Sequence, residues 1–159
     1  MKRGIRYLIL LLTLFMVTGL NAESISASSK LTYVKVNLRT EREYVYYQGK
    51  LKATVKVNTG RPGSDATPRG TFHILYKQRN TVLRGNNSNG TRYASFVHYW
   101  EPITWNGVGL HDASWVPANA FGNPKFRNYY GSHGCINNPT WEMPTVWKYT
   151  HTGETVTVY

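Results

Sequence analysis

The chain has 159 residues, a formal net charge of +11 and one cysteine. This length fits one domain of ordinary size, and its core must hold the fold because a single cysteine cannot form an internal disulfide. The basic residues are scattered and no nucleic-acid-binding motif is present, so we expect no nucleic-acid site. The charge instead suits a surface that meets an anionic polymer or acidic lipid.

Residues 1–22 have the pattern of a secretory signal peptide. A basic start is followed by an apolar run over 7–17, and Ala22 ends a stretch that suits cleavage. Cleavage there would leave about 137 residues with a net charge of +8. The alternative is an uncleaved anchor, but the run is short for a span of about 20 residues. We therefore expect export to the cell envelope, cell wall or medium, with only transient membrane contact.

The first predicted elements follow a loose, Ser-rich leader over 23–31 and open a single domain over 32–159. Apolar residues at 34, 36 and 38 alternate with polar ones, which predicts a half-buried strand. Residues 44–47 and 51–57 are β-prone and flank Gln48-Gly49-Lys50. This arrangement predicts a β-hairpin.

The rest of the chain also favours strands over helices. Pro144 argues against a regular helix over 140–149. We expect loops over 59–70 and 80–92, strands over 70–76, 96–100 and 108–111, an irregular segment over 113–130, a short helix over 140–149 and a sheet edge over 155–159. The predicted fold class is mainly β, a sandwich or barrel with one or two short helices.

The only cysteine lies in the string GSHGCINNP, Gly131 to Pro139. A neighbouring histidine favours the reactive thiolate. Gly134 removes side-chain bulk, so a substrate carbonyl can reach backbone N–H groups that stabilise an oxyanion. The alternative is a small buried cysteine, but exported proteins usually pair or avoid cysteine. One cysteine among dispersed histidines lacks the spacing of a structural zinc site, so we expect no metal and no cofactor.

Three segments together resemble the catalytic domain of the L,D-transpeptidases (the YkuD family). Ser132-His133-Gly134-Cys135-Ile136-Asn137 fits the family signature Ser/Thr-His-Gly-Cys-hydrophobic-Asn/Arg. GVGLHDASW, residues 107–115, is similar to the segment with the upstream family histidine, and residues 58–74 are similar to the stretch ending in Thr-Pro-x-Gly-x-Phe. Twenty residues separate His111 from Ser132, a few more than is usual in the family. We expect the extra length within 118–130, where it would shape the substrate mouth.

The resemblance implies a role for each residue. Cys135 would be the nucleophile and His111 its general base, held by the backbone carbonyl of Asp112. His133 would assist substrate or oxyanion, and Ser132 would support the hydrogen-bond network. Gly134 and Cys135 would offer oxyanion N–H groups.

Asn137 would hold the loop or the substrate. Tyr99 and Trp115 are candidates for lining the groove, although such aromatic residues more often belong to the core. We expect His73 to be structural, His98 to be a satisfied packing residue and His151 to be exposed.

The implied function is that of a monomeric L,D-transpeptidase that joins peptidoglycan stem peptides. The carbonyl of the third stem residue would form a thioester with the cysteine, and an amine of another stem would attack it to give a 3→3 cross-link. Two alternatives stay open at this point. Water could attack instead, which would make the protein an L,D-carboxypeptidase, or the domain could be a non-catalytic module that binds the wall.

Overall fold

The computed structural model describes residues 31–87 and 89–159. The predicted signal peptide and the leader up to residue 30 lie outside the described residues. The strands are β1 (Tyr33–Asn37), β2 (Arg42–Tyr47), β3 (Lys50–Lys56), β4 (Gly70–His73), β5 (Gln78–Asn86), β6 (Arg92–Pro102), β7 (Gly109–Asp112), β8 (Ile136–Asn138) and β9 (Thr155–Val158). The helical elements are η1 (Ala118–Ala120), η2 (Pro124–Phe126), α2 (Arg127–Tyr130) and α3 (Met143–Tyr149). None of the described helices is long and apolar enough to cross a membrane.

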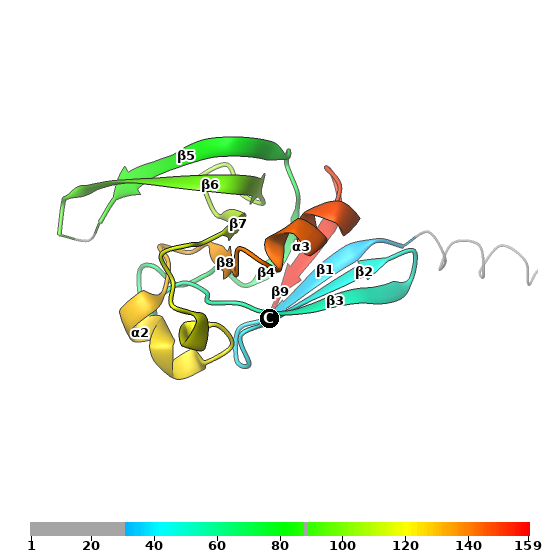
Figure 1. Ribbon diagram of the computed structural model, residues 1–159, viewed down its shortest axis with the longest axis horizontal. Helices are drawn as coiled ribbons and strands as arrows, with labels where there is room; N and C mark the ends of the chain where they lie inside the picture. Colours follow the sequence, from blue (N-terminus) through cyan, green and yellow to red (C-terminus); the bar gives the residue numbers. More distant parts are fainter. Residues whose placement is uncertain (1–30, 88) are drawn as a thin grey trace, which may run out of the picture.

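The strands form two sheets, which confirms the predicted mainly β fold (Figure 1). One sheet has the order β3-β2-β1-β9-β4, and the other has the order β5-β6-β7-β8. Val34, Val36 and Val45 of the first sheet and Leu110 and Ile136 of the second are fully buried in one shared core. Burial of these apolar faces is the main favourable contribution to folding, so the core fixes the strands that carry the site.

The hairpin predicted over 44–57 is present as β2 and β3. Gln48 and Gly49 both have positive φ, 51° and 73°, as the tightest hairpin turns require. Residues 155–159 were predicted to close a sheet edge, and this is wrong. β9 lies inside its sheet, because it pairs in parallel with β1 on one side and antiparallel with β4 on the other.

The loop predicted over 80–92 is also wrong in large part. β5 continues to Asn86 and pairs with β6 along a register that runs from Gln78↔Trp100 to Asn86↔Arg92. The polar composition suggested a loop, but polar side chains are compatible with this hairpin. One of its faces is solvated, and strand pairing uses only backbone groups. The β5–β6 hairpin extends from the body of the molecule (Figure 1).

The short helix predicted over 140–149 is present as α3, starting at Met143. Pro144 occupies the first turn, where a missing N–H costs nothing, so it starts the helix instead of breaking it. The segment predicted to be irregular over 113–130 contains η1, η2 and α2.

Candidate active site

The cysteine lies in a tight loop between α2 and β8. Gly134 has a φ of 118°, and a Cβ there would come within 3.2 Å of Val108 Cγ2. Ser132 closes the loop, since its Oγ donates to the Cys135 carbonyl at 2.6 Å and accepts the Gly134 N–H at 3.0 Å. One of the two predicted oxyanion donors, the Gly134 N–H, is therefore engaged within the loop. The other is the N–H of Cys135.

Strand register places His111 on the same face as the cysteine. β7 and β8 are parallel, with Leu110 opposite Ile136 and His111 opposite Asn137. Leu110 and Ile136 point into the core. Because successive side chains of a strand alternate between its faces, His111, Cys135 and Asn137 point the other way. All three line one groove.

The His111 ring is held in a form that can accept a proton. Its Nδ1 lies 2.9 Å from the carbonyl oxygen of Asp112, the contact expected from the sequence. A carbonyl only accepts, so Nδ1 carries the proton and Nε2 presents a lone pair. Burial lowers the pKa of His111 below its usual value of 6.5, and the ring is therefore neutral at pH 7.

The cysteine is also neutral. Burial raises the pKa of the Cys135 thiol to about 11, although a backbone hydrogen bond from Gly109 opposes the shift. The Sγ lies 3.4 Å from the Gly107 carbonyl oxygen, to which the thiol can donate. The thiolate expected from the sequence is thus not the resting form. A neutral thiol and a neutral imidazole in one groove can react by proton transfer during attack.

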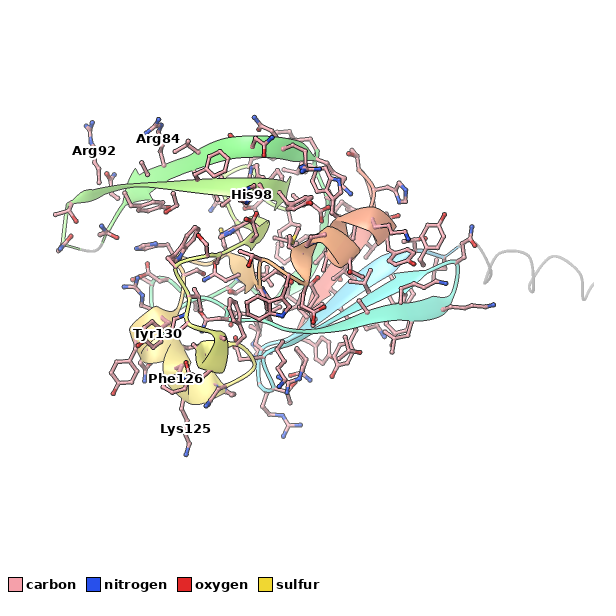
Figure 2. All side chains as sticks on the ribbon, in the orientation of Figure 1. Arg84, Arg92, His98, Lys125, Phe126 and Tyr130 are labelled. Carbon is pink, nitrogen blue, oxygen red and sulfur yellow. The ribbon has the colours of Figure 1, made fainter. Side chains whose placement is uncertain are left out.

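The Asp112 side chain serves a different purpose from its carbonyl. Its carboxylate accepts the backbone N–H groups of His98 and Tyr99 at 2.8 Å each and lies 2.9 Å from His98 Nδ1. These contacts join β7 to β6. His98, expected to be a satisfied packing residue, is satisfied by this contact, and its ring packs edge-on against Phe96 with the centroids 5.1 Å apart. Its side chain is nevertheless 57% exposed (Figure 2).

His133 lies against the β5–β6 hairpin. Its ring stacks on Tyr93 with the centroids 5.0 Å apart and the planes 8° from parallel. Gly85, opposite Tyr93 in the register, leaves room for the tyrosine ring, because a Cβ at this glycine would overlap it. The Nε2 of His133 is buried and has no hydrogen-bond partner among the described residues. His133 therefore presents an unused polar atom at the groove wall.

The groove has a volume of about 580 Å³. It is lined by the β5–β6 hairpin, the cysteine loop, α2, Arg61 and residues within 106–116. Figure 2 shows Arg92 extending outward from the hairpin and Tyr130 on α2. Trp100 and Trp115 both approach His111, each with ring centroids 5.8 Å from the imidazole. The buried Trp100 and the half-exposed Trp115 restrict the space around the base.

The structure brings most of the predicted site residues together but not Tyr99. Trp115 and Asn137 line the groove, and Asn137 Nδ2 donates to Asn58 Oδ1 at 3.4 Å. Tyr99 does not line it. Its ring instead packs against Trp147, 5.3 Å away, and under the guanidinium of Arg79 at 4.1 Å.

Sequence reasoning missed several groove residues. Tyr93 fell in a segment next to a predicted loop, and Tyr129 and Tyr130 in one predicted to be irregular. Arg61 lies in the predicted loop 59–70 and donates through Nε to the Gly131 carbonyl at 2.8 Å. The tandem aromatic pair 129–130, next to the cysteine motif, was the one available signal. Within 31–87 and 89–159, no three His, Cys, Asp or Glu side chains gather as a metal site would need.

The family model described as the L,D-transpeptidase catalytic domain matches residues 31–158. The chain belongs to this family. L,D-transpeptidase 1 of Mycobacterium tuberculosis is 34% identical over 110 residues, which are 62% of this chain and 40% of that protein. The chain thus matches less than half the length of this curated relative.

Solved L,D-transpeptidases share the fold. The crystal structure of a cysteine-to-serine variant of the Enterococcus faecium enzyme has a TM-score of 0.74 and 36% identity, covering 80% of this chain and 49% of that one. The NMR structure of the E. faecium catalytic domain acylated by ertapenem has a TM-score of 0.71 and 36% identity, covering 82% of this chain and 98% of that one. The chain therefore corresponds to the catalytic domain of these enzymes.

Proposed function

We propose that this protein is a peptidoglycan L,D-transpeptidase that works through a thioester on Cys135. The observation that carries the proposal is the placement of a proton-accepting His111 on the same groove face as the thiol. Family membership supports the reaction class, because the family model of the catalytic domain matches residues 31–158.

In the first step, the Sγ attacks the carbonyl of the third residue of a donor stem. The S–H proton passes to His111 Nε2 while the new S–C bond forms, and the oxyanion accepts a hydrogen bond from the Cys135 N–H. The C–N bond to the terminal D-alanine then breaks, and the imidazolium returns the proton to the leaving amine. A neutral starting pair suits this sequence, because charge develops only as the bond forms.

In the second step, an amine on the third residue of another stem attacks the thioester. His111 accepts the amine proton, and the new amide bond forms. The C–S bond then breaks, and the imidazolium returns the proton to the departing sulfur, which restores the thiol. The product is a 3→3 cross-link. Splitting acyl transfer into two steps in this way is ordinary covalent catalysis.

The proposed setting is the cell envelope. A signal peptide over 1–22 would deliver the domain to the wall, and the net charge of +8 that remains after cleavage suits an anionic polymer. We propose that the protein acts there as a monomer on stem peptides.

Intact-protein mass spectrometry with a carbapenem tests the thioester. Ring opening of this strained acyl donor should add one drug mass to the chain, on the peptide that contains Cys135, as ertapenem acylates the E. faecium relative. Cys135→Ala should abolish the adduct, and Cys135→Ser should make it very slow because a hydroxyl is a weaker nucleophile. A folded wild-type protein that stays unmodified and turns over no muropeptide would favour the wall-binding module.

Purified tetrapeptide muropeptides then separate transfer from hydrolysis. A transpeptidase should release D-alanine and give cross-linked dimers, detected by chromatography and mass spectrometry. Shortened monomers without dimers would instead indicate an L,D-carboxypeptidase, since the same thiol and base would serve both reactions.

A further inference from the structure

Glu41 is a buried carboxylate on a strained backbone. It lies in the turn between β1 and β2, has a φ of 51° and has no exposed surface. A left-handed backbone costs free energy for any residue with a Cβ, and burial of a carboxylate costs more unless it is paired. A glycine here would avoid both costs, so the contacts of the carboxylate must explain the residue.

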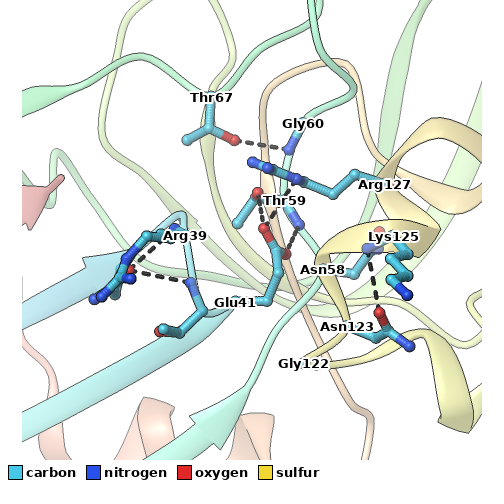
Figure 3. A network of polar contacts seen from close by, with 12 residues as sticks. Arg39, Glu41, Asn58, Thr59, Gly60, Thr67, Gly122, Asn123, Lys125 and Arg127 are labelled. Carbon is cyan, nitrogen blue, oxygen red and sulfur yellow. Dashed lines mark hydrogen bonds and ion pairs between the residues drawn. The ribbon is translucent and has the colours of Figure 1, made fainter.

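The carboxylate connects two segments that are distant in sequence (Figure 3). Its oxygens accept the backbone N–H and the Oγ–H of Thr59, both at 2.7 Å. Its Oε1 also lies 3.3 Å from Arg127 Nε on α2. Glu41 thus joins the segment around Thr59 through two hydrogen bonds and α2 through one ion pair, in which Arg127 Nε makes no hydrogen bond with any described residue.

The segment around Thr59 brackets the cysteine loop at both of its ends. Before the cysteine, Ser132 N donates to the Thr59 carbonyl at 3.2 Å, and Arg61 N donates to the Ser132 carbonyl at 3.1 Å. After the cysteine, Asn58 and Asn137 exchange two backbone hydrogen bonds of 3.0 Å each. A shift of this segment would therefore move both ends of the loop.

The second contact of Glu41 reaches the same loop by another route. α2 ends where Gly131 N donates to the Arg127 carbonyl at 2.9 Å, and the next residue is Ser132. The helix also carries Tyr129 and Tyr130, which line the groove. Fixing Arg127 therefore fixes the entry to the cysteine loop and one wall of the groove.

We propose that Glu41 is a positioning residue that fixes the cysteine loop from outside the groove. We also propose that keeping its carboxylate buried lowers the stability of the folded protein. The proposal deepens the proposed function, since it takes Cys135 as the nucleophile. Glu41 touches neither the groove nor the thiol, and it acts only through Thr59 and Arg127.

The electrostatics agree with a cost in stability. Burial raises the pKa of Glu41 above its usual 4.5, and this effect outweighs the hydrogen bonds from Thr59 and the charges of Arg127 and Arg42, the cationic groups that face it. A buried ion pair often gives no net stability over a neutral replacement of both partners, and the remaining charge is costly only where it stays buried. The Arg127 side chain is 25% exposed, so its guanidinium can reach solvent once Glu41 is neutral. Glu41→Gln should consequently loosen the cysteine loop without lowering the stability of the whole domain.

Three measurements on Glu41→Gln test the proposal. Its thermal midpoint should equal or exceed that of the wild type, while amide hydrogen exchange over 131–137 should become at least about tenfold faster. Acylation by a carbapenem should slow by roughly 10- to 100-fold, since small displacements of reacting groups carry penalties of this size. Thr59→Val should act in the same direction because it removes the hydroxyl, and Thr59→Ser should stay close to the wild type.

Glu101→Gln is the matched control for removing a buried carboxylate. Glu101 is fully buried but contacts Thr150 Oγ at 2.6 Å and Lys77 Nζ at 2.9 Å, outside the groove, so loop exchange should not change. Unchanged exchange over 131–137 in both Glu41→Gln and Thr59→Val would overturn the proposal. So would faster exchange throughout both sheets with a lower thermal midpoint. The exchange measurement tests the role of Glu41 even if the wild type is not acylated. Absence of acylation would count against the proposed function alone.

Discussion

At the scale of single residues, the protonation states of His111 and Cys135 decide how the thiol reacts. Burial disfavours charge on both groups, lowering the pKa of His111 and raising that of Cys135 to about 11. A thiol that ionised on its own would react faster with each rise in pH up to that value. A thiol that transfers its proton to His111 during attack needs only a neutral imidazole.

The pH dependence of carbapenem acylation distinguishes these two routes. In the wild type the rate should rise as pH passes the lowered pKa of His111, below 6.5, and then stay level through pH 9. The sign follows because a protonated imidazole cannot accept the thiol proton. His111→Ala should lower the level rate by about 10²- to 10⁴-fold and make it climb with pH, as the free thiolate fraction grows.

His151→Ala is the control for this experiment. His151 is exposed, pairs with Glu154 and does not line the groove, so its loss should leave the profile unchanged. Full activity of His111→Ala at pH 7 in single-turnover measurements would remove this histidine from the mechanism.

At the scale of elements, Glu43 and Asn138 connect the two sheets. Glu43 lies on β2 with no exposed surface, and its Oε2 accepts from Asn138 Nδ2 on β8 at 3.2 Å. Burial raises the pKa of Glu43 to about 8, and the nearby Glu101 adds to the shift. Glu43 Oε1 and Asn138 Oδ1 lack partners among the described residues. A proton on the carboxyl gives Glu43 a donor, so the neutral form suits this position.

We predict that this carboxyl makes the protein less stable as pH rises. The unfolded chain releases the proton near pH 4.5 and the folded chain near pH 8, so the folded state binds more protons in this window. The free energy of unfolding should then fall by roughly 1 kcal/mol per pH unit. Glu43→Gln should leave stability at pH 4.5 nearly unchanged and flatten this fall, measured by urea unfolding from pH 4.5 to 8. An equal slope in the variant would assign the pH dependence to other groups.

At the scale of the whole molecule, the groove is assembled from segments that are distant in sequence. The hairpin supplies Tyr93, the β7 segment supplies His111, and the cysteine loop and α2 supply the rest. The segment 118–130 ends in α2, whose Tyr129 and Tyr130 line the groove.

Export is the prediction that concerns the chain as a whole. We propose cleavage after Ala22, because the basic start and short apolar run have the pattern of a signal peptide. N-terminal sequencing of protein recovered from the host envelope or medium should then begin at Glu23. A membrane-bound chain that still begins at Met1 would indicate an uncleaved anchor.

The sequence alone was sufficient for the family, the fold class and most strands. The motif around Cys135 depends on local spacing, and the alternation in β1 and the turn at Gln48-Gly49 are local patterns that the sequence displays directly. Prediction failed where the local pattern was ambiguous. The polar β5 is stabilised by pairing with β6, and β9 became an inner strand because β4, which is far from it in sequence, pairs with its free side.

Only the tertiary structure decided the chemistry of the groove. Desolvation depends on which distant segments cover a group, so the neutral states of Cys135 and His111 could not be derived from their neighbours in sequence. Tertiary packing also decides which tyrosine of β6 lines the groove. Tyr93 stacks on His133 at the groove, whereas Tyr99 packs against Trp147 outside it. In the sequence, Glu41 has the pattern of an ordinary acidic turn residue. Only folding buries it and brings it against Thr59, whose segment hydrogen-bonds to the cysteine loop.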